Sequence, residues 1–227
     1  YLCSYITEHD HGDIMRTEIG LNCGRKMMQH LTRGLKKPSK NSKGDLLHMF
    51  AHNMSYDFTV GLFTLDGFNV DSSIERGSSV MAVNATYYGV RVLLHDTYAK
   101  IGEPLRKFGK MFNLKQSKEV MPYGVYTPRN IARVLVPLDE CLQHLNQCDH
   151  HQFNDNVNQW GFIRNDKVDI LAYSAKYCEI DCDVMHNGYK KFCHYIGEIC
   201  GGLNPDKFVS AASIADTYLQ QAGCYDG

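Results

Sequence analysis

The chain has 227 residues, with 24 Lys and Arg against 25 Asp and Glu, so its formal net charge is −1. Hydrophobic residues make up 44% and aromatic residues 11%. This composition is enough to bury the core of one domain and excludes a disordered chain. The longest uncharged apolar run, Phe58 to Leu65, is far shorter than the roughly 18 residues of a membrane span, so we expect no membrane partner.

The first half of the chain reads as alternating strands and short helices. Strands are predicted where β-formers alternate with small or polar residues, and helices where apolar residues recur every three or four positions. The predicted strands are Tyr1 to Thr7, Ile14 to Leu21, Leu46 to Ala51, Ser78 to Tyr88 and Gly89 to His95. The predicted helices are a short one from Gly24, a second at Met54 to Leu65, and a basic amphipathic one that Pro104 opens and that runs to Phe112.

The second half is dominated by one long helix. The stretch from Tyr123 to Asn165 is irregular, because Pro128 and Pro137 interrupt it. Apolar residues then recur at helical spacing from Leu171 to Ile199, and Gly201 and Gly202 predict the end of the helix. A last helix is predicted at Ser210 to Gln221. Strands and helices mixed in this order predict an α/β layered fold.

The chain contains nine Cys, and three of them (Cys178, Cys182 and Cys193) fall within the long predicted helix. Residues at helical spacing need no disulfide partner, and disulfide frameworks are typical of small secreted domains. We therefore expect mostly reduced thiols and an intracellular protein.

Basic residues are concentrated in two segments. Between Ile19 and Gly44 there are seven Lys and Arg and no acidic residue, and from Tyr98 to Lys118 there are six against Glu103 alone. Such segments suit the path of a polyanion. A solvated loop and a solvated helix face are the alternative interpretation. The first segment contains Arg25, Lys26, Arg33, Lys36, Lys37, Lys40 and Lys43, and the second contains Lys100, Arg106, Lys107, Lys110, Lys115 and Lys118.

Two short motifs carry the candidate chemistry. The first, from His52 to Phe58, contains Asn-x-x-Tyr-Asp and lies where a buried strand passes into a helix. The second, Tyr177 to Asp181, lies within the long helix, where residues four apart share a face. Paired carboxylates suit a metal-dependent hydrolase, in which two divalent ions stabilise the attacking and leaving oxygens of a phosphoryl displacement. A Tyr hydroxyl one turn before a carboxylate suits the orientation of the attacking water.

In this order and context, the two motifs resemble the second and third exonuclease motifs of family B DNA polymerases. The closer resemblance is to the protein-primed branch found in viruses, phages and organellar linear plasmids. Three further segments are similar to that branch: His95 to Tyr98 with the basic segment after it, Lys118 to Tyr123, and Tyr177 to Asp183. The resemblance implies a ribonuclease H-like 3′–5′ exonuclease domain, with a mixed sheet flanked by helices.

The resemblance also implies roles for single residues. It makes Asp57 and Asp181 the ligands of two divalent ions (Mg²⁺ or Mn²⁺), and Tyr177 the residue that positions the water. Lys118 would stabilise charge at the scissile phosphate. The residues implied to hold the 3′ end of single-stranded DNA are Asn53, Tyr56, Thr97, Tyr98 and Tyr123. Aromatic side chains suit sequence-tolerant stacking on unpaired bases, and the alternative for these residues is ordinary packing or capping.

One departure from the family limits the activity that we expect. The first exonuclease motif, Asp-x-Glu on a strand, is missing, because Glu8-His9-Asp10 has the reverse order in a polar turn. We expect that motif upstream of Tyr1, an exonuclease domain over residues 1–200, and the start of the connection to the polymerase palm at 201–227. The fragment alone should then be inactive. In the parent enzyme, encoded by a virus or mobile element, primer-template DNA and a priming terminal protein are the implied partners.

Two alternatives differ in class from a DNA exonuclease. One is a non-catalytic module of the same fold that binds single-stranded nucleic acid, and the other is a nuclease that acts on RNA. A Cys and His cluster accompanies the first alternative as a candidate structural zinc site, although its spacing does not match a standard zinc finger, and part of it also fits one helix face. The cluster consists of Cys141, His144, Cys148, His150 and His151.

Overall fold

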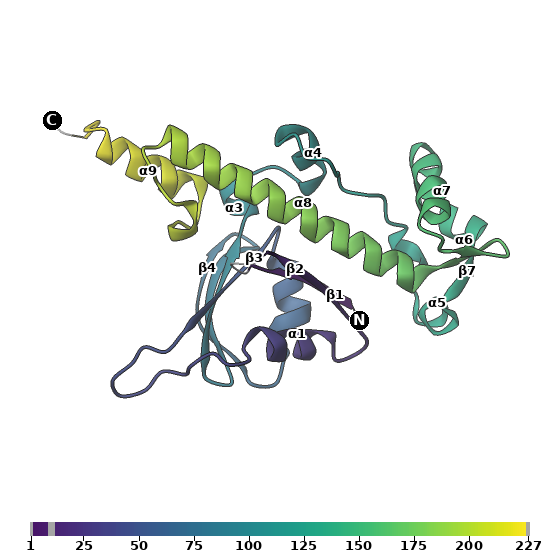
Figure 1. The fold of residues 1–227 in the computed structure, drawn as a ribbon, viewed down its shortest axis with the longest axis horizontal. Helices are drawn as coiled ribbons and strands as arrows, with labels where there is room; N and C mark the ends of the chain where they lie inside the picture. Colours follow the sequence, from purple (N-terminus) through teal and green to yellow (C-terminus); the bar gives the residue numbers. More distant parts are fainter. Residues whose placement is uncertain (1, 9–11, 226–227) are drawn as a thin grey trace.

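A computed structural model describes residues 2–8 and 12–225. One long helix, α8 (Ile170–Ile199), crosses the whole molecule, and the other elements are arranged along it (Figure 1). The main sheet and α1 (Cys23–Leu31) lie on one side of α8. A smaller unit, built from residues 123–169, lies at the N-terminal end of α8, and α9 (Ala211–Gln221) lies at its C-terminal end. Of the residues discussed above, Tyr1, His9 and Asp10 lie outside the described residues, as do positions 226 and 227.

The main sheet has four strands in the order β3-β6-β5-β4, with β3 parallel to β6 and the other pairs antiparallel. The predicted mixed α/β sheet flanked by helices is therefore confirmed. Three of its strands follow the predicted positions closely, whereas β4, an exposed edge strand with two register shifts, was not predicted. The bounds are β3 (Leu46–Ala51), β4 (Phe68–Arg76), β5 (Ser79–Tyr87) and β6 (Val90–Asp96).

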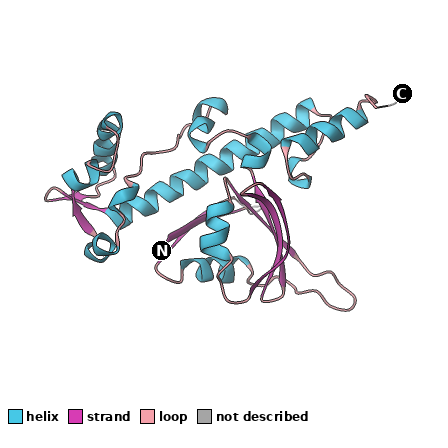
Figure 2. Cartoon of the chain, turned by 180° about the vertical axis from the view of Figure 1, so that it is seen from behind, coloured by secondary structure: helices cyan, strands magenta, loops and turns pink. Residues whose placement is uncertain are grey.

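The two faces of the sheet pack against different elements. Alternate residues of β3 point to opposite faces, as the strand period requires. Leu47, Met49 and Ala51 join an apolar core with α1 and with the N-terminal strand β1 (Leu2–Thr7). On the opposite face, the Phe50 ring lies 5.2 Å from the ring of Tyr189 on α8. Figure 2 shows the sheet from behind, with the long helix α8 running above it.

The two predicted N-terminal strands form a hairpin that is attached to α8. Strands β1 (Leu2–Thr7) and β2 (Ile14–Ile19) pair in antiparallel orientation. The Thr17 hydroxyl donates a hydrogen bond to Glu179 Oε1 at 3.0 Å, and the Cys182 thiol donates one to the Ser4 carbonyl oxygen at 3.2 Å. The hairpin therefore holds the segment of α8 that carries the second motif.

Two predicted helices are shorter than expected. The expected helix at Met54 to Leu65 consists of one turn, α2 (Ser55–Asp57), followed by a π-helical turn, η1 (Phe58–Leu62). The basic helix is also interrupted: Pro104 has extended backbone, with ψ 148°, and precedes a 3₁₀ turn, η2 (Leu105–Lys107), instead of opening an α-helix. Only α4 (Phe108–Met111) continues it. A further short helix, α3 (Tyr98–Ile101), follows β6 directly.

The irregular stretch folds into a small unit with its own apolar core. Val125, Val136 and Phe153 are fully buried there and pack against Tyr173 of α8. None of its helices or short strands was predicted. They are η3 (Tyr123–Val125), α5 (Pro128–Arg133), β7 (Leu135–Pro137), α6 (Leu138–Leu142), η4 (Gln147–Asp149), α7 (His150–Gln159), β8 (Ile163–Arg164) and β9 (Lys167–Asp169).

The two C-terminal helices follow the predictions closely. Asp169 caps α8 by accepting the Ala172 N–H at 2.9 Å, and Gly201 and Gly202, both with positive φ, follow its end. A 3₁₀ turn, η5 (Pro205–Lys207), leads to α9 (Ala211–Gln221), which Ser210 caps. All nine Cys lie in the described part of the chain as free thiols.

We predict that Gly188→Ala lowers the free energy of unfolding. A Cβ at Gly188 of α8 would lie 2.5 Å from the ring of Phe108, which is fully buried and unable to move aside. Overpacking of this kind costs about 1–3 kcal/mol, whereas the gain in helix propensity from Gly to Ala is about 1 kcal/mol. Urea denaturation should therefore show a net loss.

Gly197→Ala is the matched control, because it lies on the same helix and its Cβ would meet nothing nearer than 3.9 Å. This variant should be as stable as the wild type or more so. Equal stabilisation by both substitutions would contradict the close packing at Gly188.

Candidate functional site

The site is built around a buried carboxylate at the end of β6. Asp96 is only 3% exposed, and its Oδ1 accepts the backbone N–H groups of Asn53 and Tyr98, each at 2.8 Å. Its Oδ2 accepts the backbone N–H of Met54 at 3.2 Å. These bonds hold Asn53 in a left-handed conformation with φ 61°. Asp96 thereby fixes the turns that follow two neighbouring parallel strands.

Thr97 adds a second connection between the same strand ends. Its side chain is fully buried, and its hydroxyl donates to the Ala51 carbonyl oxygen at 3.0 Å. Because the hydroxyl hydrogen is used there, His52 Nδ1, at 2.9 Å, must donate to the same oxygen. Thr97 therefore braces the two strand ends with a buried side chain, and its contact with DNA stays a prediction.

Asp57 lies one helical turn beyond Asn53, at the end of α2, and its side chain is exposed. The protein around it nevertheless raises the pKa of this carboxyl group, first by desolvation and then through the charge of Asp96. The positive charge of Lys118 opposes the shift. The pKa of Asp57 is therefore influenced by two nearby charges, those of Asp96 and Lys118.

On α8, Asp181 and Tyr177 meet two residues of the 118–123 segment. The Lys118 ammonium group forms a short ion pair with Asp181 Oδ2, and it also lies 4.8 Å from the centroid of the Tyr177 ring. The Tyr177 and Tyr123 hydroxyl groups lie 2.9 Å apart and share a hydrogen bond. Four of the predicted site residues are thus in direct contact.

The burial of Tyr177 and the partial burial of Asp181 shift the pKa values of both groups. Burial raises the pKa of Asp181, and the charge of Lys118 is the main opposing influence. Burial and the neighbouring Asp181 charge raise the pKa of Tyr177, so its hydroxyl group stays protonated at neutral pH. Tyr177 is suited to orient a water molecule and is unsuited to act as a base.

The positive charge of Lys118 acts on both candidate metal-binding carboxylates, Asp57 and Asp181. Its charge lowers the pKa of Asp57 and that of Asp181. Conversely, the charges of both carboxylates, together with burial, raise the pKa of Cys178 on α8 to about 11. Asp57 of the first motif and Asp181 of the second therefore both influence the pKa of Cys178, and both are influenced by Lys118.

The donor set fits a divalent cation in one specific respect. Asp181 Oδ1 is buried and accepts no hydrogen bond of ordinary geometry from the described residues. A carboxylate oxygen left in this state is costly unless a cation or water binds it. Oxygen ligands such as Asp57 and Asp181 are also those that Mg²⁺ and Mn²⁺ prefer.

The remaining predicted DNA-binding side chains are open to solvent. Tyr56 is 72% exposed, Tyr98 is 42% exposed and Tyr123 is 68% exposed, and Asn53 is exposed as well. The Tyr98 ring packs edge-on against His52 at 5.4 Å, which orients it at the strand end. These four side chains have the accessibility that contacts to a nucleic acid strand require.

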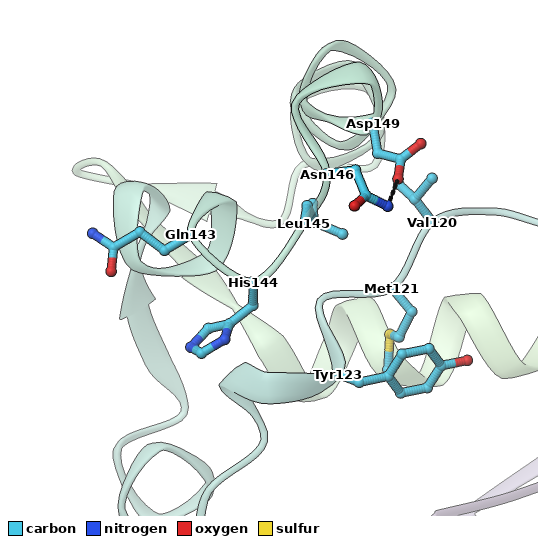
Figure 3. A pocket seen from close by; sticks show the side chains of 8 residues that line it. All are labelled: Val120, Met121, Tyr123, Gln143, His144, Leu145, Asn146 and Asp149. Atoms are coloured by element: carbon cyan, nitrogen blue, oxygen red, sulfur yellow. Dashed lines mark hydrogen bonds between the residues drawn. The ribbon is translucent and has the colours of Figure 1, made fainter.

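A pocket of about 500 Å³ opens beside Tyr123. Figure 3 shows it between the 120–123 segment and the loop that joins α6 to α7. Asn146 donates a hydrogen bond to Asp149 across its rim at 3.2 Å. The pocket is lined by Val120, Met121, Tyr123, Gln143, His144, Leu145, Asn146 and Asp149.

Lys100 does not belong to the basic surface that the sequence indicated. It is only 2% exposed, and its ammonium group donates to the Tyr189 hydroxyl at 2.9 Å. Tyr189 in turn donates to Asp206 Oδ1 at 2.8 Å. Burial lowers the pKa of Lys100. This lysine connects α3 to α8 and to the C-terminal segment.

The structure does not support the candidate zinc site. Cys141 is fully buried in the core of the small unit, and His151 pairs with Asp155 at 2.8 Å. Within residues 2–8 and 12–225, the Cys and His residues of the 141–151 cluster do not form a convergent metal-ligand group. These Cys and His residues are close in sequence but lie on different helices: Cys141 on α6, Cys148 on η4, and His150 and His151 on α7.

A different acidic group has metal-like spacing. Glu8, Asp13 and His186 converge where the β1–β2 hairpin meets α8. Asp13 Oδ2 already contacts His186 Nε2 at 2.8 Å and the Lys190 ammonium group at 2.9 Å. This cluster therefore attaches the hairpin by ion pairs.

Sequence reasoning gave no role to Asp96 or Glu119. Glu119 Oε2 accepts hydrogen bonds from Gln152 at 2.6 Å and Asn156 at 2.9 Å, and these bonds anchor the segment that carries Lys118. The sequence could have indicated a role only for Asp96, because this carboxylate stands at the end of a strand whose apolar residues alternate.

The described residues thus contain a strand-end carboxylate, a helix carboxylate paired with a lysine, and exposed tyrosines beside them. The sequence profile described as "DNA polymerase type B, organellar and viral" matches residues 39–222. The chain therefore belongs to this family of organellar and viral type B DNA polymerases.

Two other comparisons add less. No curated protein matches the chain. A solved structure of phi29 DNA polymerase complexed with single-stranded DNA is similar at a TM-score of 0.34 and 14% identity, over 72% of this chain and 32% of that chain. The chain thus spans about a third of the length of that polymerase. None of the described helices is both long and apolar enough to cross a membrane.

We predict that Asp96→Asn destabilises the domain by about 2–3 kcal/mol. The amide NH₂ group is unable to accept a backbone N–H, so at least one charge-assisted hydrogen bond at the strand ends is lost. Removal of the Asp96 charge should also lower the pKa of Asp57, which Asp96 raises. Chemical denaturation and NMR titration of the Asp57 carboxyl group measure the two effects.

The control is Asp71→Asn on the exposed β4 strand, which should change neither quantity. An Asp96→Asn variant with wild-type stability would show that the three N–H contacts do not hold the strand ends.

We predict that Lys118→Met raises the pKa of Asp181 further. Lys118 supplies the main influence that lowers this pKa, and burial would then act almost unopposed. NMR titration of ¹³C-labelled carboxyl groups measures the shift. Lys107→Met is the control, because Lys107 pairs with Glu103 on the surface at 2.7 Å. An unchanged Asp181 pKa in Lys118→Met would contradict the ion pair.

Proposed function

We propose that this chain is most of the 3′–5′ proofreading exonuclease domain of a protein-primed family B DNA polymerase. The proposal assigns a ribonuclease H-like domain to residues 1–200 and the start of the connection to the palm to 201–227. The single observation that carries it is the contact between Lys118, Asp181 and Tyr177, with Tyr123 at its edge. Family membership supports the polymerase context.

In this proposal, Asp57 and Asp181 hold divalent metal ions, either Mg²⁺ or Mn²⁺. Two bound ions would activate the attacking water and stabilise the leaving oxygen of the terminal phosphodiester. The buried Asp181 Oδ1, which accepts no hydrogen bond of ordinary geometry from the described residues, supports this assignment. Two carboxylates are too few to hold two ions, so we propose that the chain alone is inactive and that an Asp-x-Glu strand completes the site in the parent enzyme.

The other residues prepare the reaction. Tyr177, held protonated by burial, donates a hydrogen bond that orients the attacking water. Lys118 places a positive charge where the phosphoryl oxygens develop negative charge. The ion pair with Asp181 keeps the lysine in position before the substrate arrives.

In this proposal, exposed tyrosine and asparagine side chains hold the DNA single strand. Tyr56, Tyr98 and Tyr123 offer ring faces for stacking on the unpaired bases of a 3′ end, and Asn53 offers an amide to the backbone. Such stacking tolerates any sequence, as proofreading requires. In the parent enzyme, primer-template DNA and a priming terminal protein would be further partners, and a virus or mobile element would encode it.

The decisive test removes one carboxylate in the full-length polymerase. We expect Asp57→Ala to lower 3′–5′ degradation of single-stranded DNA by roughly two or more orders of magnitude, because loss of an outer-shell partner alone costs 10–100-fold. Extension of a matched primer should be retained. In the same assay with Mn²⁺, the 227-residue chain alone should not trim DNA efficiently.

Asp71→Ala on the exposed β4 strand is the matched control and should leave degradation unchanged. Full exonuclease activity in Asp57→Ala would contradict the proposal and favour a non-catalytic module that binds single strands. Faster cleavage of RNA than of DNA by the wild type would favour the RNA nuclease.

A further inference from the structure

The loop from 32 to 45, between α1 and β3, has a defined shape. At its tip, the backbones of Ser39 and Ser42 exchange hydrogen bonds of 2.8 and 3.2 Å. At its base, the Asp45 N–H donates to the Lys36 carbonyl oxygen, and Asp45 Oδ2 accepts the Lys36 N–H, both at 2.8 Å. Gly44 permits this closure, because a Cβ there would lie 2.6 Å from the Lys36 backbone.

This loop is a concentrated and uncompensated positive surface. All seven basic side chains between Arg25 and Lys43 are exposed, and five of them lie on the loop itself. None of the seven forms an ion pair with another described residue. The one acidic residue at the base of the loop, Asp45, already accepts a backbone N–H. Arg91 of β6 adds a further guanidinium group, which donates to the Lys43 carbonyl oxygen at 3.2 Å.

The loop is separate from the candidate catalytic site. In Figures 1 and 2 it projects from the molecule on the side of the sheet away from α8, which carries Tyr177 and Asp181. No residue of the loop belongs to the cluster around Lys118. A ligand on this surface would therefore be bound independently of the proposed exonuclease.

The composition of the loop indicates what kind of polyanion it fits. Residues 32–45 include five Lys and Arg but no aromatic residue. Sites for single strands combine positive charge with aromatic stacking platforms, and the tyrosines near Asp57 and Tyr177 have that character. Positive charge without aromatic side chains suits the phosphates of a duplex, whose bases are already stacked.

We propose that the 32–45 loop binds the sugar–phosphate backbone of double-stranded DNA without sequence preference. Lys36, Lys37, Lys40 and Lys43 supply the phosphate contacts. The fixed hairpin shape presents these side chains together, so little ordering of the backbone is needed on binding. The loop gives the domain a duplex contact that does not use the residues of the proposed exonuclease.

The test measures binding of blunt-ended duplex DNA to the 227-residue chain over a range of salt concentrations. In the variant with Lys36→Gln, Lys37→Gln, Lys40→Gln and Lys43→Gln, the affinity should fall. The slope of log K against log salt should decrease in magnitude by about 0.9 for each lost phosphate contact. A variant with Arg at the same four positions should keep both the affinity and the slope.

The matched control removes four exposed positive charges from the small unit at the N-terminal end of α8. It carries Arg129→Gln, Arg133→Gln, Arg164→Gln and Lys167→Gln, so its net charge equals that of the loop variant. We expect wild-type duplex binding from this control. Because all substituted side chains are exposed, we expect every variant to fold, and circular dichroism checks this.

Three outcomes would overturn the proposal. The first is a loop variant with wild-type affinity and slope, and the second is an equal loss in the loop variant and the control. The third is loss of single-strand binding with duplex binding unchanged. None of these outcomes bears on the exonuclease assay, so the two proposals fail separately.

Discussion

The arrangement of the candidate site depends on the Asp96 carboxylate. A buried charge is tolerated only when hydrogen bonds replace its water, and three backbone N–H groups do so here. These bonds join the ends of two parallel strands and set the left-handed turn at Asn53. The position of Asp57 follows, because it lies one turn further along the same segment. A single buried side chain thus places a residue that never contacts its carboxylate.

The second half of the site depends on a long helix and an extended segment that meet at Lys118. Glu119, anchored by Gln152 and Asn156, holds the segment against the small unit, and Lys118 then reaches Asp181. Burial would favour the neutral form of Asp181, and the lysine offsets that tendency. The same lysine charge acts on Asp57. Lys118 therefore opposes the effect of burial on the pKa of both carboxyl groups.

The sequence predicted the elements whose burial follows a simple period. Strands β3, β5 and β6 and helix α8 each bury one face or both, so the spacing of their apolar residues was informative. Strand β4 was missed because its side chains beyond Phe68 are exposed, which removes the alternation. Lys100 was assigned to the surface because its burial depends on Tyr189, 89 positions away. The contact between Lys118 and Asp181, which lie 63 positions apart, was not predicted for the same reason; the motif resemblance gave each residue a role but did not pair them.

Helix α8 has a mechanical consequence for the whole domain. Its 30 residues form a rod of about 45 Å, with Tyr177 and Asp181 near the start and the Lys100–Tyr189–Asp206 chain toward the end. The C-terminal segment, through Asp206, is therefore bonded to the same rigid body as the carboxylate. Tyr189 and Asp181 lie eight residues apart on this helix, roughly 12 Å along its axis, so a tilt of about 5° around one of them would move the other by roughly 1 Å. A shift of the C-terminal segment that tilts α8 through the Tyr189–Asp206 hydrogen bond therefore also moves Asp181.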